Sequence, residues 1–231
     1  MAGPREAKAH AFVADLAAPV LDDDDRHHLE RVLRLRPGDL VTVADGAGSW
    51  RPCRFGADLV PDGPVVVEPP PEPPVAVAFA VVKGDRPEWA VQKLTELGVD
   101  RLVPIRCARS VVRWEGPRGE RHLERLRRVA REAAMQSRRA RLPEVEAMTT
   151  FTEVARRPGA LLAEPGGRPL AVGDALVVVG PEGGWTPEEL GAGPAAVSLG
   201  PTVLRAETAA VAAGVLLTAL RPGGALTAKG G

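Results

Sequence analysis

The sequence predicts an α/β protein in which a small β-rich module precedes a larger domain built on a mainly parallel sheet. The 231-residue chain is interrupted at residues 68–74 by "EPPPEPP", whose prolines preclude a helix and favour an extended connector. Short alternating segments and turns precede this connector. After it, apolar strands alternate with helices, which is the order typical of parallel α/β sheets.

The first domain is expected over residues 1–70. A short helix is followed by the alternating strand "LVTVAD" at 40–45, the turn "DGAG" at 45–48 and the strand "PVVVE" at 64–68. Four aspartates at 22–25 lie just before the helix. We expect them to form a solvated loop at its N-terminus, where negative charge is favourable.

The second domain is expected over residues 75–231, where apolar strand segments and helical segments follow one another. The expected strands are 75–82, 101–105, 160–164, 175–180 and 196–200. The expected helices are 86–97, 118–139, one that begins at about 186, and 207–220.

Several helix ends in this domain have recognisable capping residues. Asp85 with Glu88, and Thr186 with Glu189, have the spacing of a capping box, in which each side chain bonds to the other residue's backbone N–H. Gly98 follows the 86–97 helix and is expected to end it in the left-handed conformation. These residues predict helix starts at about 86 and 187.

Composition excludes several classes of protein. The apolar content is 45%, and no apolar run approaches the ~18 residues of a membrane span. The N-terminus "MAGPREAKAHAFV" lacks the apolar region of a secretion signal, so the cytoplasm is the expected location and no membrane partner is expected. Cys53 and Cys107 have no cysteine or histidine neighbours at ligand spacing, so we expect no metal site.

Charge is distributed unevenly although the net charge is zero. Residues 1–74 carry 8 basic and 13 acidic side chains, a net −5, whereas residues 101–141 carry 13 arginines and 4 glutamates, a net +9. The planar guanidinium group donates paired hydrogen bonds to phosphate, so nucleic acid is the leading partner. The alternative is that these arginines form only a solvated helix face.

Two loops each end an apolar strand in Gly-Pro: "VVVGPEGG" at 177–184 and "VSLGPTVLR" at 197–205. Open α/β sheets bind ligands beyond the carboxyl ends of their strands, which is where both loops are expected. Neither loop has GxGxxG or a phosphate-binding lysine. This favours an adenosine-type ligand held by backbone hydrogen bonds, although either loop alone would be read as a structural turn.

Together the two loops resemble a known enzyme family. "VGPEGGWTPEEL" at 179–190 and "LGPTVLRAETAAVAA" at 199–213 are similar to the paired loops of the SPOUT methyltransferases. Within that superfamily they resemble the bacterial 16S ribosomal RNA uridine-N3 methyltransferases. The resemblance therefore suggests methyl transfer to RNA.

Three further blocks resemble the same family in the same order, so that the resemblance covers nearly the whole chain. They are "HHLERVLRLRPGDLVTVADGAG" at 27–48, "KGDRPEWAVQKLTELGV" at 83–99 and "REAAMQSRRARLPEV" at 131–145. The last block departs from the family pattern. Met135 stands where a glutamate is expected, and Arg139 is taken to replace a glycine.

The resemblance implies a PUA-like RNA-binding β-barrel module followed by a SPOUT α/β domain with a C-terminal trefoil knot at roughly 160–220. It also implies a homodimer that uses S-adenosylmethionine bound in the knot. The residues matching the family's cofactor loops are Leu162, Glu164, Gly180, Glu182, Gly183, Gly184, Leu199, Gly200, Leu204 and Arg205.

Arg205 and Glu207 in "LRAET" are the candidate catalytic residues. We expect Arg205 to stabilise negative charge that spreads onto the uracil carbonyl oxygens. Glu207 is expected to orient that arginine or to assist removal of the N3 proton. Glu182 is a second candidate for orienting substrate or cofactor. The alternative for each carboxylate is a structural role near a helix N-terminus.

The expected RNA partner is 16S ribosomal RNA within the 30S subunit. The candidate contacts are His28, Arg31, Arg34, Arg36, Arg106, Arg109, Arg113, Arg138 and Arg139. Two alternatives stay open: a methyltransferase of the same superfamily acting on a ribose 2′-hydroxyl, and a non-catalytic RNA-binding factor in ribosome assembly.

Overall fold

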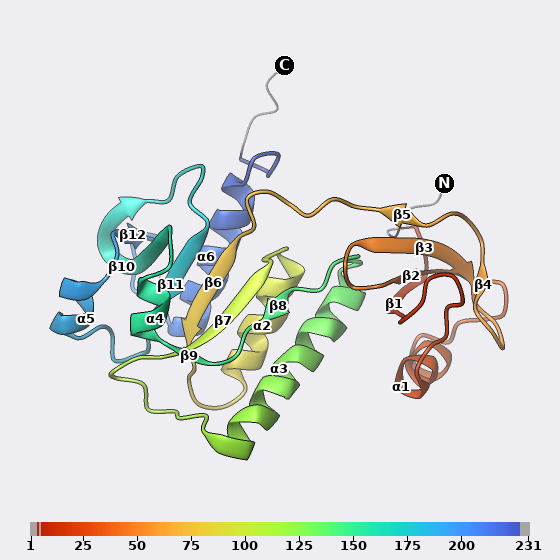
Figure 1. Cartoon of the computed structure of the whole chain (residues 1–231), viewed down its shortest axis with the longest axis horizontal. Coiled ribbons are helices and arrows are strands. Elements are labelled where there is room, and N and C mark those ends of the chain that lie inside the picture. The colour runs from red at the N-terminus through yellow and green to blue at the C-terminus, as the bar shows by residue number, and fades with distance from the viewer. Residues whose placement is uncertain (1–3, 5, 227–231) are drawn as a thin grey trace. The chain divides into compact units, whose positions relative to one another are not determined.

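The computed structural model describes residues 4 and 6–226 and divides the chain into two compact units (Figure 1). Unit 1 comprises Met1–Pro70 and Arg131–Leu142, and unit 2 comprises Pro71–Ala130 and Pro143–Gly231. The segment 131–142, expected in the second domain, groups with unit 1. Its apolar side chains pack in the core of that unit, which the linear order of the chain does not reveal.

Unit 1 is built on a five-stranded sheet. Strands β2, β3 and β4 follow one another as antiparallel neighbours, β5 also pairs with β3, and β1 lies parallel to β2. The expected strands near 40–45 and 64–68 are confirmed, whereas β1 and β4 are too short for a periodic pattern. The strands are β1 (Ala9–Phe12), β2 (Leu40–Ala44), β3 (Ser49–Arg54), β4 (Val60–Pro61) and β5 (Val66–Val67).

The acidic run of unit 1 begins a helix instead of forming a loop. Asp22 is the N-cap of α1 (Asp23–His27), and its side chain accepts a hydrogen bond from the backbone N–H of Asp25 at 2.7 Å. The chain continues into η1 (His28–Val32), a π-helical turn. Asp25 is buried, so the expectation of a wholly solvated aspartate loop is wrong for that residue.

Unit 2 is built on a seven-stranded sheet in which every recorded pair is parallel, as expected. The strand order is β12-β10-β11-β6-β7-β8, with β9 also paired to β7. The two-residue strands β8 and β9 were not expected. The strands are β6 (Ala76–Ala80), β7 (Arg101–Arg106), β8 (Glu144–Val145), β9 (Thr149–Thr150), β10 (Ala160–Pro169), β11 (Leu176–Val179) and β12 (Ala196–Ser198).

Helices cover both faces of this sheet. On one face, Leu94, Leu126 and Leu217 from three helices form a core with Val77 and Phe79 of β6. The opposite face of the same strand carries only alanines, which pack against Phe151 and other residues. The helices are α2 (Arg86–Glu96), α3 (Gly116–Gln136), α4 (Phe151–Ala155), α5 (Pro187–Ala192) and α6 (Ala206–Leu220) (Figure 1).

The helix ends confirm most of the expected capping. Thr186 and Glu189 form the predicted capping box of α5, and Gly98 has the predicted left-handed conformation with φ +89°. The predicted capping box at Asp85 is wrong. Its backbone is not extended, with ψ 6°, and its side chain makes no capping bond. A capping box that begins at Thr150, at the start of α4, was not predicted.

At the C-terminal end of α3, the expected position of the glycine in the family pattern is wrong by one residue. The glycine of the family pattern was placed at Arg139, but the left-handed backbone, with φ +62°, is at Arg138. Arg139 N donates to Ala134 O at 3.0 Å, which is the long-range bond of a Schellman cap. Arg138 is therefore the residue that stands where glycine would be favoured.

Within residues 4 and 6–226, no helix combines the length and apolarity needed to cross a membrane.

Candidate active site

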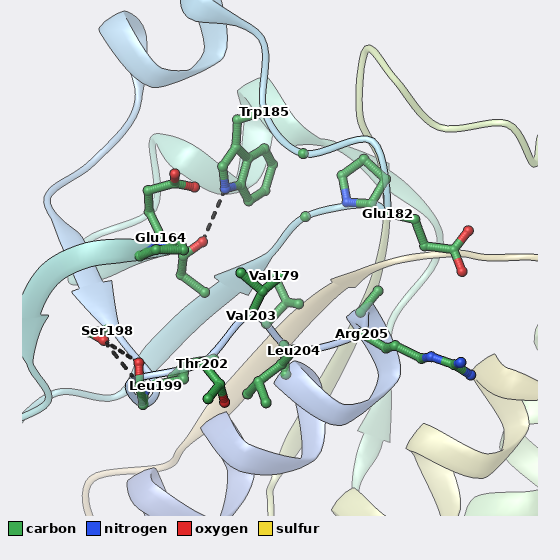
Figure 2. Close-up of a pocket in the computed structure, with 18 residues that line it drawn as sticks. Glu164, Val179, Glu182, Trp185, Ser198, Leu199, Thr202, Val203, Leu204 and Arg205 are labelled. Atoms are coloured by element: carbon green, nitrogen blue, oxygen red, sulfur yellow. Dashed lines mark hydrogen bonds between the residues drawn. The ribbon is translucent and has the colours of Figure 1, made fainter.

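A cavity of about 470 Å³ lies where three segments of unit 2 meet (Figure 2). The segments are residues 163–165 of β10, residues 179–185, which begin at the last residue of β11, and residues 198–206, which run from the end of β12 to the start of α6. The two expected Gly-Pro loops are therefore opposite walls of one pocket. Its volume lies within the range of about 300–1,000 Å³ typical of small-molecule sites.

The first wall is held by Trp185. Its indole Nε1 donates to the backbone O of Ala163 at 3.1 Å, which joins the glycine turn to β10. A Cβ on Gly180 would lie 2.9 Å from the indole ring, so only glycine allows the ring to pack here. Gly184 N donates to Pro181 O at 2.8 Å and closes the turn. The packing of this wall therefore depends on its tryptophan and its glycines.

The second wall leaves much of its backbone open to a ligand. Ser198 Oγ donates to Gly200 O at 3.1 Å and fixes the start of the loop. Val203 is 89% exposed beside the cavity, and Leu204 also lines it. This wall offers apolar side chains, and no hydrogen bond from the peptide groups of residues 201–204 to the described residues is recorded. Such a wall suits a heterocycle better than a phosphate chain.

Eight of the ten expected cofactor residues line the cavity. Leu162 does not, because it is 1% exposed and packs in the core. Gly183 does not line it either, and its carbonyl O accepts a hydrogen bond from Arg109 Nη1 at 2.9 Å. Some further lining residues fall inside the predicted loops but were not singled out: Ala163, Thr202 and Val203. Others lie just outside those loops and were missed: Pro165, Val179 and Ala209. The eight are Glu164, Gly180, Glu182, Gly184, Leu199, Gly200, Leu204 and Arg205.

Of the two candidate catalytic residues, Arg205 lines the cavity and Glu207 does not. Arg205 is the exposed N-cap residue of α6, and its guanidinium has no recorded hydrogen bond or ion pair with residues 4 and 6–226. Glu207 follows in the first turn and is largely buried, with 13% of its side chain exposed. Its expected pairing with Arg205 is not found within the described chain; its Oε1 lies 3.8 Å from Nε of Arg86.

Arg86 is the residue of this region that sequence reasoning missed. It begins α2, and its Nη1 also hydrogen bonds to Glu182 Oε1 of the glycine turn. The sequence did contain a signal for Arg86: it is a charged residue a few positions after the buried strand β6, and ligands bind at the carboxyl edge of a parallel sheet. Arg86 therefore connects α2 to both segments that carry candidate site carboxylates.

Four of the expected RNA contacts are exposed in unit 1, as RNA binding requires. Arg138 is only partly exposed, and its Nη2 donates to Lys8 O at 2.9 Å. Arg139 is partly exposed too, and its backbone O bonds to His10 Nε2 at 3.0 Å. These two have structural contacts within unit 1. The four exposed residues are His28, Arg31, Arg34 and Arg36.

The other three expected RNA contacts are exposed in unit 2. Arg106 and Arg113 line a second cavity, of about 650 Å³, near the end of β7. Arg106 forms an ion pair with Glu115 at 3.0 Å, whereas Arg109 donates to the glycine turn as described. The structure thus brings Arg106 and Arg113 together and places Arg109 on the outer side of the cofactor loop.

No group of three or more histidine, cysteine, aspartate or glutamate side chains within residues 4 and 6–226 is placed to hold a metal ion. Burial raises the pKa of the Cys107 thiol to about 12 and that of Cys53 to about 11. Both remain protonated near neutral pH, so neither is a ready nucleophile.

Comparison with known proteins identifies the class. Residues 69–218 match the family described as RNA methyltransferase domain, and residues 21–57 match the RNA methyltransferase PUA domain. The chain is therefore an RNA methyltransferase with an N-terminal PUA domain.

More specifically, the chain belongs to the ribosomal RNA small subunit methyltransferase E family. It is 38% identical over 224 residues to the Mycobacterium bovis protein of that name, an alignment that covers 85% of this chain and 84% of the relative.

Two solved structures are similar over most of their length. One is ribosomal RNA small subunit methyltransferase E from Neisseria gonorrhoeae bound to S-adenosyl methionine, with 28% identity, a TM-score of 0.76, and coverage of 92% of this chain and 97% of that one. The other is a putative methyltransferase from Legionella pneumophila with the cofactor SAM bound, with 25% identity, a TM-score of 0.78, and coverage of 91% and 96%. S-adenosylmethionine is the cofactor of these relatives.

The cavity of this chain fits the same cofactor. Its charged lining consists of two carboxylates, Glu164 and Glu182, and one guanidinium, Arg205, which sum to −1. S-adenosylmethionine carries a sulfonium, an ammonium and a carboxylate, which sum to +1. The charges are complementary, and the glycine-rich, apolar walls suit the adenosine moiety.

Proposed function

We propose that this protein transfers a methyl group from S-adenosylmethionine to N3 of a specific uridine in 16S ribosomal RNA of the 30S subunit. The observation that carries the proposal is the cavity itself: its charge is complementary to that of the cofactor, and it is lined by Arg205, for which no side-chain partner is recorded among residues 4 and 6–226. The names of its relatives and the resemblance of its loops support the choice of RNA and of atom.

The chain's own residues would bind and orient the reactants. The wall that contains Gly180 and the wall that contains Leu204 would hold the cofactor between them. The cofactor supplies an electrophilic methyl group. Uridine N3 must lose its proton and use the freed electron pair to form the new C–N bond, while the methyl–sulfur bond breaks. Negative charge would then spread to the flanking carbonyl oxygens, where Arg205 would stabilise it. Glu207 is the carboxylate available in the same turn to take the proton.

The family resemblance extends the proposal to a trefoil knot over residues 160–220 and to a homodimer. The three segments that enclose the cavity all fall within that range, which supports a shared knotted site. Helix α6 has many small residues, and these permit close packing of a second helix. Sedimentation of the purified protein should give twice the monomer mass; a monomer would contradict this part of the proposal.

The activity is tested with small ribosomal subunits that lack the modification. The protein is incubated with them and isotopically labelled S-adenosylmethionine, and the product is identified by nucleoside mass spectrometry. We expect 3-methyluridine in 16S ribosomal RNA. A 2′-O-methylated nucleoside would move the protein to the ribose-modifying class, and RNA binding with no methylated product would indicate a non-catalytic assembly factor.

Arg205→Ala is the matching variant for the mechanism. Loss of one charge-stabilising donor is expected to lower kcat by about 10²-fold, while the folded fraction remains unchanged because the side chain is exposed. Arg205→Lys is the control that keeps the positive charge and should retain more activity. Equal activity of the alanine variant and the wild type would exclude the role given to Arg205.

A further inference from the structure

Arg86 occupies a position between two carboxylates that belong to different parts of the site. Its Nη1 hydrogen bonds to Glu182 Oε1, and its Nε lies 3.8 Å from Glu207 Oε1. Glu182 lines the cofactor cavity, and Glu207 lies two residues after Arg205. One guanidinium on α2 therefore contacts both acidic side chains that flank the candidate catalytic arginine.

The four charged groups could pair in more than one way. Arg86 and Arg205 supply two positive charges, and Glu182 and Glu207 supply two negative ones. In the structure Arg86 contacts both carboxylates, and no partner of the Arg205 guanidinium is recorded among residues 4 and 6–226. The side chains of Glu182 and Arg205 extend toward the same side of the pocket (Figure 2).

This arrangement matters because a guanidinium that is paired with a carboxylate attracts other anions less strongly. The side chain of Glu182 is 55% exposed and can change its rotamer when it is not held. If it were released, it would be a competing partner for Arg205 on the same side of the cavity. Glu207 is more constrained, since only 13% of its side chain is exposed.

We propose that Arg86 is a positioning residue that holds Glu182 and Glu207 away from Arg205, so that the Arg205 guanidinium stays available for the negative charge of the RNA substrate. The inference rests on the proposed function, because it assigns Arg205 to the substrate. It gives α2 a part in methyl transfer although Arg86 itself does not line the cofactor cavity.

The test compares Arg86→Met with the double variant Arg86→Met/Glu182→Gln. Arg86→Met should lower kcat by about fivefold, the factor that corresponds to one exposed ion pair. The double variant should recover most of this loss, because a neutral glutamine competes weakly for Arg205. Arg86→Lys should keep most of the activity, since an ammonium can still attract both carboxylates.

Two measurements separate positioning from a merely structural role. Calorimetry should give the same S-adenosylmethionine affinity for Arg86→Met as for the wild type; a parallel loss of affinity would mean that Arg86 only supports the glycine turn. Glu88→Gln is the matched control, because it weakens another ion pair, 3.0 Å long, between the first turn of α2 and Arg125. Its kcat should not change. A double variant no more active than Arg86→Met would overturn the inference.

A binding experiment without methyl transfer keeps this inference distinguishable from the proposed function. The affinity of a uridine-containing RNA fragment is measured by fluorescence anisotropy in the absence of S-adenosylmethionine. Arg86→Met should weaken binding, but by less than Arg205→Ala does, and the added Glu182→Gln should restore it. If the wild type forms no 3-methyluridine, the proposed function fails, while unchanged binding by Arg86→Met overturns the positioning role by itself.

Discussion

Arg131 in unit 1 and Arg86 in unit 2 each contact two carboxylates, but their surroundings differ. Arg131 donates to both oxygens of Asp25, at 3.0 and 2.6 Å, reaches Asp22 at 3.4 Å and lies over the ring of Phe12, 5.8 Å from its centre. Asp25 has only 8% of its side chain exposed, whereas Glu182, the hydrogen-bonded partner of Arg86, is 55% exposed.

The comparison shows that the number of ion pairs does not decide what an arginine contributes. A buried carboxylate without its cation keeps the cost of its lost hydration, so Arg131 contributes strongly to the stability of the folded state. The hydrogen-bonded partner of Arg86, Glu182, is exposed and stays hydrated whether or not it is paired, and the largely buried Glu207 lies 3.8 Å away, beyond hydrogen-bond distance, so Arg86 adds less to stability than Arg131 does. What Arg86 can change is the orientation of side chains beside the cofactor cavity.

The largest expected effect is the difference in stability between Arg131→Met and Arg86→Met. Arg131→Met leaves Asp25 buried and unpaired and should reduce the free energy of unfolding by about 3–5 kcal/mol. Arg86→Met should reduce it by less than about 1 kcal/mol. Urea titrations followed by circular dichroism measure both.

The control for that prediction is Arg131→Met/Asp25→Leu. Removal of the buried charge together with its partner should restore a large part of the lost stability. Equal losses for Arg131→Met and Arg86→Met, or no recovery in the double variant, would break the contrast between the two arginines.

A second prediction concerns His10, another buried polar residue of unit 1. Burial lowers its pKa from 6.5 to about 4, despite the hydrogen bond between Nε2 and the backbone O of Arg139. Nε2 must carry the proton, so Nδ1 accepts from the Thr42 hydroxyl at 2.8 Å. The neutral ring therefore satisfies both of its partners.

Because the pKa is lower in the folded protein, the unfolded chain binds a proton first as the pH falls. The stability contributed by neutral His10 is complete above about pH 6.5 and is lost toward pH 4, by about 3 kcal/mol in total. Urea titrations at pH 7 and pH 4.5 should show a smaller difference for His10→Gln than for the wild type. Equal differences would mean that titration of His10 contributes nothing to the pH dependence of stability.

The smallest expected effect on stability is that of Gly180→Ala in unit 2. The added Cβ would lie 2.9 Å from the ring of Trp185, which must move, at a cost of about 1–3 kcal/mol. Because Trp185 lines the cavity, calorimetry should show weaker S-adenosylmethionine binding. Gly191→Ala is the control: a Cβ there meets no atom within 4 Å, and α5 should tolerate it. If both variants bind the cofactor as the wild type does, Trp185 does not shape the cavity.

Local chemistry explains which elements could be predicted from the sequence. Thr186 and Glu189 lie three residues apart on one helical turn, so their capping box follows from sequence spacing alone. The same spacing at Asp85 failed, because an N-cap side chain reaches the helix only from an extended backbone, and the chain at Asp85 adopts another conformation. The strand β8 has two residues and owes its existence to pairing with β7.

The candidate site likewise has features that the sequence predicts and features that it does not. The Gly-Pro loops were predictable because each follows an apolar strand, and parallel strands bring their carboxyl ends to one edge of a sheet. The exclusion of Leu162 was not predictable from the resemblance, which matches a whole loop and does not say which of its side chains points into the core. Arg86 was missed because its partners lie 96 and 121 residues away in the sequence.

The sequence by itself determined the alternation of strands and helices, the two glycine-proline loops, most helix ends and the concentration of arginine, because these depend on neighbouring residues and on composition. The tertiary structure alone decided that residues 131–142 pack in unit 1 and that Arg86 contacts Glu182 and Glu207. It also left the guanidinium of Arg205 with no recorded partner among residues 4 and 6–226. The physical reason is that charge pairing and burial depend on distances in space, and folding brings together residues that the chain keeps far apart.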